Sequence, residues 1–203
     1  IAEALSTRAE RKVQLLTPRR GDKRKPVEHA TANAREALGR RLAESTTHRR
    51  ALDALAKRLD LDNAPARIEV YDNSHIQGSN AIGAMIVSGP DGLIKNAYRK
   101  FNIKTVGAGG DAEAGDDYAM MREVLTRRFT RALKEDPDRS EGNWPDLVVV
   151  DGGRGQLGIA EEVFAELGID DVYLLGVAKG PDRNAGRERF YVPDGGGFTL
   201  PPR

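Results

Sequence analysis

The chain has 203 residues, a formal net charge of +1, 39% hydrophobic residues, 31% charged residues and no cysteine. These numbers suit one large globular domain, or a domain with an appendage, and they exclude disulfides and thiolate metal sites. The sequence lacks an apolar run near the roughly 20 residues that a membrane-spanning helix needs. We expect a cytoplasmic protein, because the lack of cysteine fits a reducing compartment. The chain starts with Ile and shows no signal-peptide pattern, which suggests a fragment of something longer.

Charge is distributed unevenly along the chain. Residues 1–60 contain 15 Lys or Arg against 8 Asp or Glu, an excess of seven positive charges, whereas the remainder contains 17 against 23. A basic segment ahead of an acid-rich domain suggests a nucleic-acid contact in the first part. A solvated helical face would give the same pattern, and the sequence leaves the two open.

Residues 1–62 are predicted to be mainly helical. A short helical stretch and a basic loop precede a region, from Val27 to about Leu61, in which leucines recur at helical spacing with alanines between them. This predicts one long helix, or two, with a thin apolar stripe. "DNAPA" at 62–66 breaks the helix. We therefore divide the chain into a helical basic segment, 1–62, and a second domain, 63–203.

The periodicity changes after the break. Residues 67–72 alternate and are rich in β-formers, and residues 81–88 form a second predicted strand. The Asp-Gly of "GPDG" at 89–92 favours a hairpin turn that leads into a returning strand at 93–104. A glycine-rich loop is expected at 105–115.

Helices and strands then alternate. Asp116 and Asp117 begin a predicted helix, because acidic residues are favoured at the positive helix end. The strand at 146–151 is apolar until its last residue, as a central parallel strand would be. A helix closed by Gly168 follows. Two further segments complete the chain: a buried strand at 172–180 and a hairpin-like stretch at 190–203. The order predicts an α/β domain with a mixed sheet flanked by helices.

Two of the predicted strands end in an aspartate, Asp72 and Asp151. Functional groups converge at strand ends in α/β sheets, and carboxylates are the ligands that Mg²⁺ prefers. Two ions about 3.5–4 Å apart could activate water and steady the leaving oxygen of a phosphodiester. Either aspartate could instead only cap the turn after its strand. Gly152 and Gly153 would keep the surroundings of Asp151 open for a phosphate backbone.

A dinucleotide site is the rival interpretation of this region. "GRGQLG" at 153–158 matches G-x-G-x-x-G, follows a strand and opens a helix. The position of Asp151 argues against a dinucleotide site, because this residue stands just ahead of the first glycine, where its charge would oppose a pyrophosphate. A dinucleotide site also needs an acidic residue about 20 residues further on. The acidic residues at that distance, Asp170 and Asp171, fall before the next strand and not at its end.

The three histidines and the basic clusters have both functional and structural explanations. His29 and His48 are expected at the helical surface, whereas His75 is either a metal neighbour or a loop-fixing hydrogen-bond donor. Basic residues beside aromatic or small residues could hold phosphates, although an edge strand or a solvated helix would look alike. The basic residues predicted to contact DNA are Arg99, Lys100, Arg127, Arg128, Lys179, Arg183, Arg187 and Arg189.

Five segments in order between residues 67 and 192 resemble the C-terminal endonuclease region of the UvrC family, a component of the bacterial nucleotide-excision-repair excinuclease. The segments are "YDNSHIQGSNAIGAMIV", "YRKFNIK", "GDDYAMMREVLTRRF", "PDLVVVDGGRGQL" and "GVAKGPDRNAGRERF". Residues 1–60 also resemble the segment that precedes this region in the family.

The resemblance implies an RNase H-like fold and incision of damaged double-stranded DNA 5′ to the lesion, together with a UvrB-type subunit. The family uses an Asp-Asp-His set with a divalent metal, Mg²⁺ or Mn²⁺. Its first Asp, in the motif Y/F-D-x-S-H, falls on Asp72, and its second, in D-G-G, falls on Asp151. The family's His lies beyond "FTLPPR", so the predicted domain 63–203 stops before it.

We therefore expect a metal-dependent DNA endonuclease domain in which Asp72 and Asp151 bind the metal, with His75 and Asp117 as neighbours. For Asp116 and Asp117, helix capping is the alternative role. A different function also fits the sequence: an RNase H-like module that binds DNA or a protein partner without catalysis.

Overall fold

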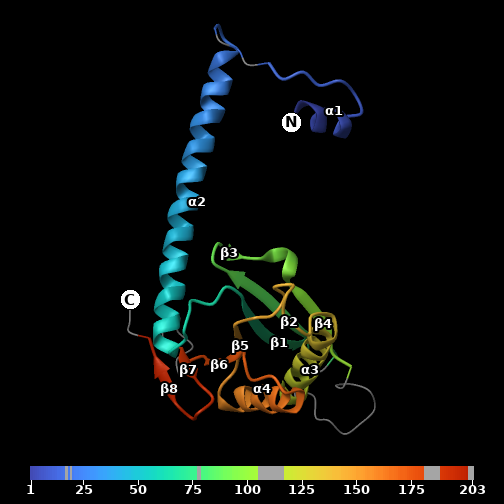
Figure 1. Ribbon diagram of the computed structural model, residues 1–203, viewed down its shortest axis with the longest axis vertical. Helices are drawn as coiled ribbons and strands as arrows, with labels where there is room; N and C mark the ends of the chain where they lie inside the picture. Colours follow the sequence, from blue (N-terminus) through green and yellow to red (C-terminus); the bar gives the residue numbers. More distant parts are fainter. Residues whose placement is uncertain (17, 19, 77–78, 105–116, 181–187, 201–203) are drawn as a thin grey trace. The chain divides into compact units, whose positions relative to one another are not determined.

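The computed structural model describes residues 1–16, 18, 20–76, 79–104, 117–180 and 188–200 of the chain (Figure 1). Contacts divide the chain into two compact units, Ile1–Thr47 and His48–Arg203. The boundary falls within a helix, ahead of the break predicted at 62–66. The turns after it belong to the second unit, because His48 Nε2 lies 2.9 Å from the Gly89 carbonyl and Arg49 pairs with Asp91.

The first unit contains α1 (Ala2–Arg8) and the beginning of α2 (Arg24–Leu59). The predicted helical region is thus one continuous helix and not two. The predicted leucine stripe divides at the boundary between the units. Leu38 and Leu42 are exposed, whereas Leu52 of the second unit is buried, with Leu55 and Leu59 packed beside it. The described part of the first unit has no core of its own on this helix.

The second unit is built on a mixed sheet of eight strands among the described residues. Its order is β3-β2-β1-β5-β6-β7-β8, with β4 paired to β2. The pairs β1–β5 and β5–β6 are parallel, and the remaining pairs are antiparallel. The strands are β1 (Ile68–Ile76), β2 (Ser79–Gly89), β3 (Gly92–Leu93), β4 (Arg99–Asn102), β5 (Leu147–Asp151), β6 (Tyr173–Ala178), β7 (Arg189–Tyr191) and β8 (Gly197–Thr199).

Two strands differ in extent from the sequence prediction. The first was expected to end at Asp72, but β1 continues to Ile76 because its antiparallel pairing with β2 continues to that residue. The returning strand expected at 93–104 is divided into β3, a 3₁₀ turn at Lys95–Ala97 and β4. The hairpin turn is present, with Gly92 at φ +106°, a conformation that side chains rarely adopt. The glycine-rich loop predicted at 105–115 lies outside the described residues.

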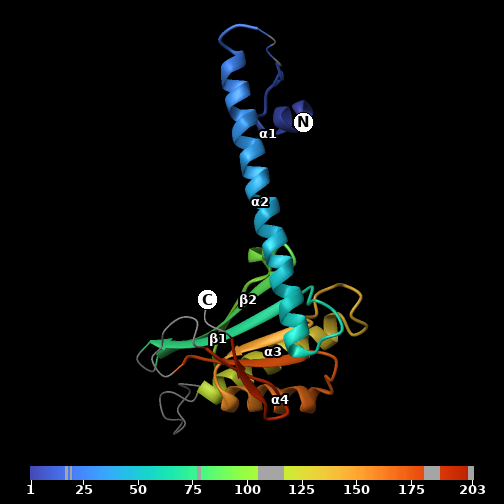
Figure 2. The ribbon, with the colours of Figure 1, turned by 90° about the vertical axis from the view of Figure 1, so that its left-hand side faces the viewer.

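Two helices cover one face of the sheet, α3 (Asp117–Glu135) and α4 (Arg154–Leu167) (Figure 2). Their apolar residues recur at helical spacing, so each helix presents one buried stripe to the strands. The rings of Phe129 and Phe164 meet edge to face between the helices, with centroids 4.6 Å apart. Gly168 ends α4 in the left-handed conformation, φ +67°, as predicted.

The opposite face of the sheet has a smaller apolar cluster. The last turns of α2 contribute Leu52 and Leu55, which pack with Leu147 and Leu175 near the amino ends of the parallel strands. Phe190 and Phe198 of the C-terminal hairpin stack at 5.1 Å within the same cluster. Among the helices of the described residues, none has the length and apolarity to cross a membrane.

Candidate active site

Asp72 and Asp151 occupy neighbouring positions on two adjacent parallel strands. Tyr71 of β1 is in register with Val150 of β5, so the next residue of each strand is one of the two aspartates. Adjacent strands lie about 4.8 Å apart, and successive side chains point to opposite faces. Because Tyr71 and Val150 belong to the core beneath α3 and α4, both carboxylates project from the opposite face. The structure therefore brings these two aspartates together on one face of the sheet.

Both carboxylates are accessible, and the charge of Asp151 acts on Asp72. Asp72 is exposed, and the Asp151 side chain is 37% exposed. Partial burial raises the pKa of Asp72, and the negative charge of Asp151 raises it further. Lys179 and the backbone N–H of Asn73 act on this pKa in the opposite direction. A second carboxylate close enough to oppose the ionisation of Asp72 makes this a position at which a cation is favoured.

Two lysines lie on or beside this face. Lys179 follows β6 directly, and its Nζ lies 3.6 Å from Asp151 Oδ2. Lys100 of β4 pairs with Ala84 of β2, which in turn pairs with Asp72. Residues directly opposite each other in an antiparallel pair share a face, so Lys100 projects from the face of Asp72 at two strand spacings, about 10 Å.

The other predicted neighbours of the site are described only in part. Asp117 is the first residue of α3, and its charge contributes to the raised pKa of Asp72 after the larger effects of burial and of Asp151. The side chain of His75 and the whole of Asp116 lie outside the described residues. Among the residues that the structure describes, no group of three His, Cys, Asp or Glu side chains is arranged to hold a metal ion.

Of the remaining basic residues predicted to contact DNA, the four that the structure describes lie away from the two carboxylates. Arg99 pairs with Met85, on the α3 face of the sheet, and Arg189 pairs with Ala178, on the face opposite to Val177 and hence to Asp151. Arg127 and Arg128 belong to α3. Arg183 and Arg187 lie outside the described residues.

Arg128 has a structural partner in the sheet. Its side chain is only 13% exposed and donates to Glu69 Oε1 and to the Asn143 carbonyl. Because its guanidinium is engaged below the surface, we assign Arg128 to an internal network and not to the DNA-contacting surface predicted from the sequence.

The glycines of "GRGQLG" serve helix packing. A Cβ on Gly155 would overlap the ring and hydroxyl of Tyr118, which lies over the first turn of α4. Gly155 therefore permits the close approach of α3 to α4, and the space that a pyrophosphate would need at this helix start is occupied. Gly152 likewise leaves room for the side chain of Gln156 and not for a ligand. The geometry disfavours a dinucleotide site here.

The donor set of the two aspartates fits a hard divalent cation. Mg²⁺ usually takes one or two carboxylates and completes its coordination with water and substrate phosphate oxygens. Asp72 and Asp151 supply two accessible carboxylates on one face, with a third acid, Asp117, close enough to influence Asp72. The carboxylate ligands thus match Mg²⁺ or Mn²⁺, and the chain offers no thiolate for a softer metal.

The sequence interpretation missed the buried acid Glu69 and its partners. Glu69 is fully buried and accepts hydrogen bonds from Arg67, Arg128 and the Tyr71 hydroxyl, the last at 2.6 Å. Burial, and then the charge of Glu69, raise the pKa of Tyr71 well above its ordinary value. An acid at an inward position of an alternating strand was the available signal, but its partners are distant in sequence.

A family model described as the UvrC RNAse H endonuclease domain matches residues 56–203, and one described as the UvrC Ribonuclease H-like domain matches residues 1–41. The chain belongs to the UvrC family. The family resemblance and the RNase H-like α/β fold predicted from the sequence are thereby confirmed, and a nuclease role follows at the level of the family.

Proteins called UvrABC system protein C are similar over nearly the whole chain. The one from Paramagnetospirillum magneticum is 65% identical over 95% of this chain, and the one from Rhodospirillum rubrum is 58% identical over 98%. The protein of Sphingopyxis alaskensis is 57% identical over 99%. The chain spans about 30% of the length of these curated relatives, 30% or 31% in each case.

Solved structures with partial similarity are endonucleases V. The Ciona intestinalis Endonuclease V, in complex with a 24mer DNA that contains an inosine, has 13% identity and a TM-score of 0.40, covering 71% of this chain and 59% of that chain. Human ENDOV has 17% identity and a TM-score of 0.38, covering 56% of this chain and 45% of that chain.

Proposed function

We propose that this chain is a metal-dependent endodeoxyribonuclease domain that hydrolyses one phosphodiester 5′ to a lesion in double-stranded DNA, within an excinuclease that includes a UvrB-type subunit. The catalytic part is residues 63–203. The observation that carries the proposal is the register of β1 and β5, which puts Asp72 and Asp151 side by side and accessible on one face. Membership of the UvrC RNase H endonuclease domain family supports the same activity.

Asp72 and Asp151 would hold Mg²⁺ or Mn²⁺ through their carboxylate oxygens. When bound, such an ion supplies a nucleophilic water at neutral pH and neutralises charge on the phosphate. The strands fix the two carboxylates, because the backbone of β5 is hydrogen-bonded to β1 on one side and to β6 on the other. A site held by a central strand loses little entropy when a ligand binds.

Lys179 and Lys100 would hold the DNA backbone on either side of the carboxylates. Lysine binds phosphate as a point charge and reads no base sequence. Binding that does not depend on base sequence suits a repair nuclease, because such an enzyme recognises the damaged shape of the duplex and not its base order. The product ends would be a 5′-phosphate and a 3′-hydroxyl.

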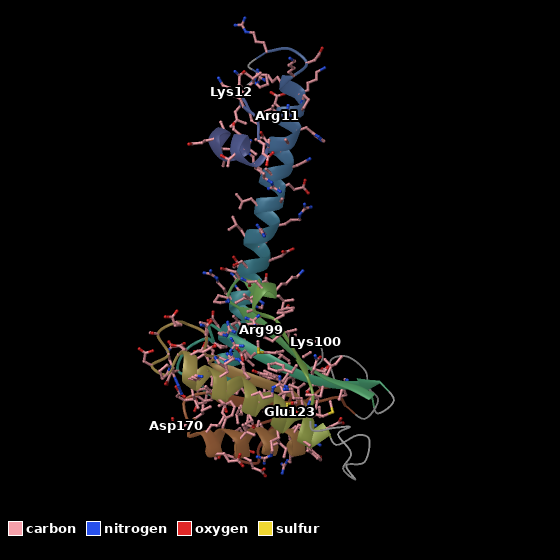
Figure 3. All side chains as sticks on the ribbon, turned by 90° about the vertical axis from the view of Figure 1, so that its right-hand side faces the viewer. Arg11, Lys12, Arg99, Lys100, Glu123 and Asp170 are labelled. Carbon is pink, nitrogen blue, oxygen red and sulfur yellow. The ribbon has the colours of Figure 1, made fainter. Side chains whose placement is uncertain are left out.

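Metal binding and DNA nicking by matched variants test this proposal. Mn²⁺ binding to the chain, followed by electron paramagnetic resonance, is expected to be lost in Asp151→Asn and retained in Asp170→Asn. Asp170 lies in the turn before β6, at the other end of that strand from the partner of Asp151 (Figure 3). Failure of the unaltered chain to bind Mn²⁺, or equal binding by both variants, would overturn the metal site.

A binding module without catalysis is the second candidate. It is favoured by the finding that the described residues contain no three-ligand group for a metal. In that case a lesion-containing duplex would bind at the lysines, but neither the unaltered chain nor Asp151→Asn would nick it when Mn²⁺ is added. Metal-dependent nicking that Asp151→Asn abolishes decides for the endonuclease.

A further inference from the structure

A hollow of about 200 Å³ lies on the face of the sheet opposite to Asp72 and Asp151. It is bordered by α3, by β4 and by the start of β1, and Met85 and Phe101 supply apolar wall. The polar lining is dominated by five arginines from these three elements. They are Arg67, Arg99, Arg127, Arg128 and Arg131.

Positive charge exceeds negative charge in this arginine pocket. The lining contains two carboxylates, Glu135 and Asp136, against five guanidiniums. Glu69 beneath the lining and Glu123 beside Arg127 neutralise two more charges and leave an excess of one. Arg99 donates to the carbonyl groups of Asn96 and Tyr98, so its charge is not offset by a carboxylate among the contacts that the described residues show.

Two of these arginines are held rigidly before any ligand arrives. Glu69 Oε1 accepts hydrogen bonds from Arg67 Nε at 3.0 Å and from Arg67 Nη2 at 2.8 Å. It also accepts one from Arg128 Nη2 at 2.8 Å. Two guanidiniums on one carboxylate leave net positive charge at the base of the pocket. Such a buried charged cluster is weak evidence for stability, because well-packed apolar residues would serve as well. Fixed guanidinium forks are useful where an anion must be recognised.

Asp136, one of the lining residues, contains a buried acceptor atom. Asp136 is 2% exposed, and its Oδ1 accepts the Glu141 N–H at 3.1 Å. Its Oδ2 is buried and has no hydrogen-bond partner within the described part of the chain. Because Oδ2 has no exposed surface, a ligand in the hollow would not contact it, and the excess of guanidinium groups is the feature of this lining that favours an anionic ligand.

We propose that the arginine pocket binds the phosphate group of a phosphate monoester, such as a sugar phosphate. Tetrahedral phosphate oxygens accept from several directions, whereas a planar carboxylate is satisfied by one fork, and these arginines converge from three elements. The phosphate is either a small molecule or the end of a nucleic-acid strand. The site is independent of the proposed nuclease function, because it requires neither the metal nor cleavage.

The position of Arg99 provides a sharp test. Arg99 and Lys100 are neighbours on β4, but they project from opposite faces of the sheet (Figure 3). Arg99 and Arg131 are exposed, so their replacement leaves the Glu69 network intact. Lys134 is an exposed cation of α3 that does not line the pocket, and it gives a matched control for loss of one charge.

The experiment titrates the 203-residue chain with ribose 5-phosphate and follows the fluorescence of Trp144, the single tryptophan, whose indole donates to the Asp136 carbonyl at 2.7 Å. We expect saturable binding that weakens roughly tenfold in Arg99→Gln and in Arg131→Gln, the loss of one charge-assisted contact. Lys134→Gln should bind as the unaltered chain does.

A second titration separates the possible sources of the phosphate. Anisotropy of a labelled oligonucleotide with a 5′-phosphate should show the same order of variants if the phosphate belongs to a strand end. A variant effect confined to ribose 5-phosphate assigns the pocket to a small molecule. The proposal fails if binding is not saturable, if Lys134→Gln weakens it equally, or if an acidic peptide binds and the phosphates do not.

Discussion

The ammonium of Lys179 lies 3.6 Å from Oδ2 of Asp151, one of the two carboxylates proposed to hold a metal. Asp151 is in register with Val177, two residues before Lys179, so the end of β6 brings the lysine to the aspartate. In the absence of a metal, the lysine supplies the positive charge that two neighbouring acids require. A divalent ion bound as proposed would therefore compete with Lys179 for the same oxygens.

We predict that Lys179→Met has opposite effects on metal and on DNA. Two unit charges about 4 Å apart in water interact by about 1 kcal/mol, so removal of the ammonium should tighten Mn²⁺ binding about fivefold. Binding of a DNA duplex should weaken severalfold, because one backbone contact is lost. Calorimetric titration with Mn²⁺ and fluorescence anisotropy with DNA measure the two effects. A variant that weakens both would show that Lys179 supports the fold of the site and does not compete with the ion.

Asp72→Asn is expected to stabilise the fold. Partial burial and the charge of Asp151 raise the pKa of Asp72 above 3.8, so the folded state binds more protons than the unfolded state between the two pKa values. The free energy of unfolding contributed by this group therefore falls as pH rises through that window. At pH 7 the variant should melt roughly 1–3 °C higher than the unaltered chain, a small gain because solvent screens Asp72.

The pH dependence checks this interpretation. The difference in melting temperature should shrink as pH falls from the raised pKa of Asp72 towards 3.8, since the unaltered side chain is then increasingly protonated in the folded state. Asp170→Asn, at an exposed turn, is the control and should show no such trend. An Asp72→Asn variant that melts lower at pH 7 would contradict the prediction.

Local patterns predicted the parts of the site that lie on regular strands. The apolar run before Asp151 and the alternation before Asp72 placed both residues on strands, and the structure pairs those strands in parallel. The sequence could not predict the face to which each basic residue projects. That depends on register: Lys100 shares a face with Asp72 only because Ala84 stands between them in the ladder.

Local sequence patterns also could not predict which polar side chains are buried. The sequence suggests that Arg128 is a surface cation on a helix. In the structure its guanidinium instead donates to the buried side chain of Glu69, which lies 59 positions earlier. Likewise, the glycines of "GRGQLG" fit a nucleotide motif until the position of Tyr118 over Gly155 is known. In both cases the deciding contact joins residues far apart in sequence, and only tertiary packing reveals it.

Removal of Glu69 is predicted to be severely destabilising. Glu69→Leu would leave Arg67 and Arg128 without their shared carboxylate, and breaking a buried pair in this way typically costs about 3–5 kcal/mol. Glu135→Gln, which removes an exposed partner of Arg131, should change stability by less than about 1 kcal/mol. Urea unfolding followed by Trp144 fluorescence compares them. Equal losses would mean that Glu69 is not the centre of the network.

Two glycines of α4 should respond oppositely to alanine. Gly158 has open space around its position, so Gly158→Ala is expected to stabilise the protein by about 0.5–1 kcal/mol through higher helix propensity. At Gly155 a Cβ would overlap Tyr118, so Gly155→Ala should cancel that gain or destabilise the protein. Adding Tyr118→Ala to Gly155→Ala should restore the gain relative to Tyr118→Ala alone. Urea unfolding of the four variants measures the coupling between the two positions. If Gly155→Ala were stabilising by itself, the packing explanation for this glycine would be wrong, and the space at the start of α4 would again be open to a ligand.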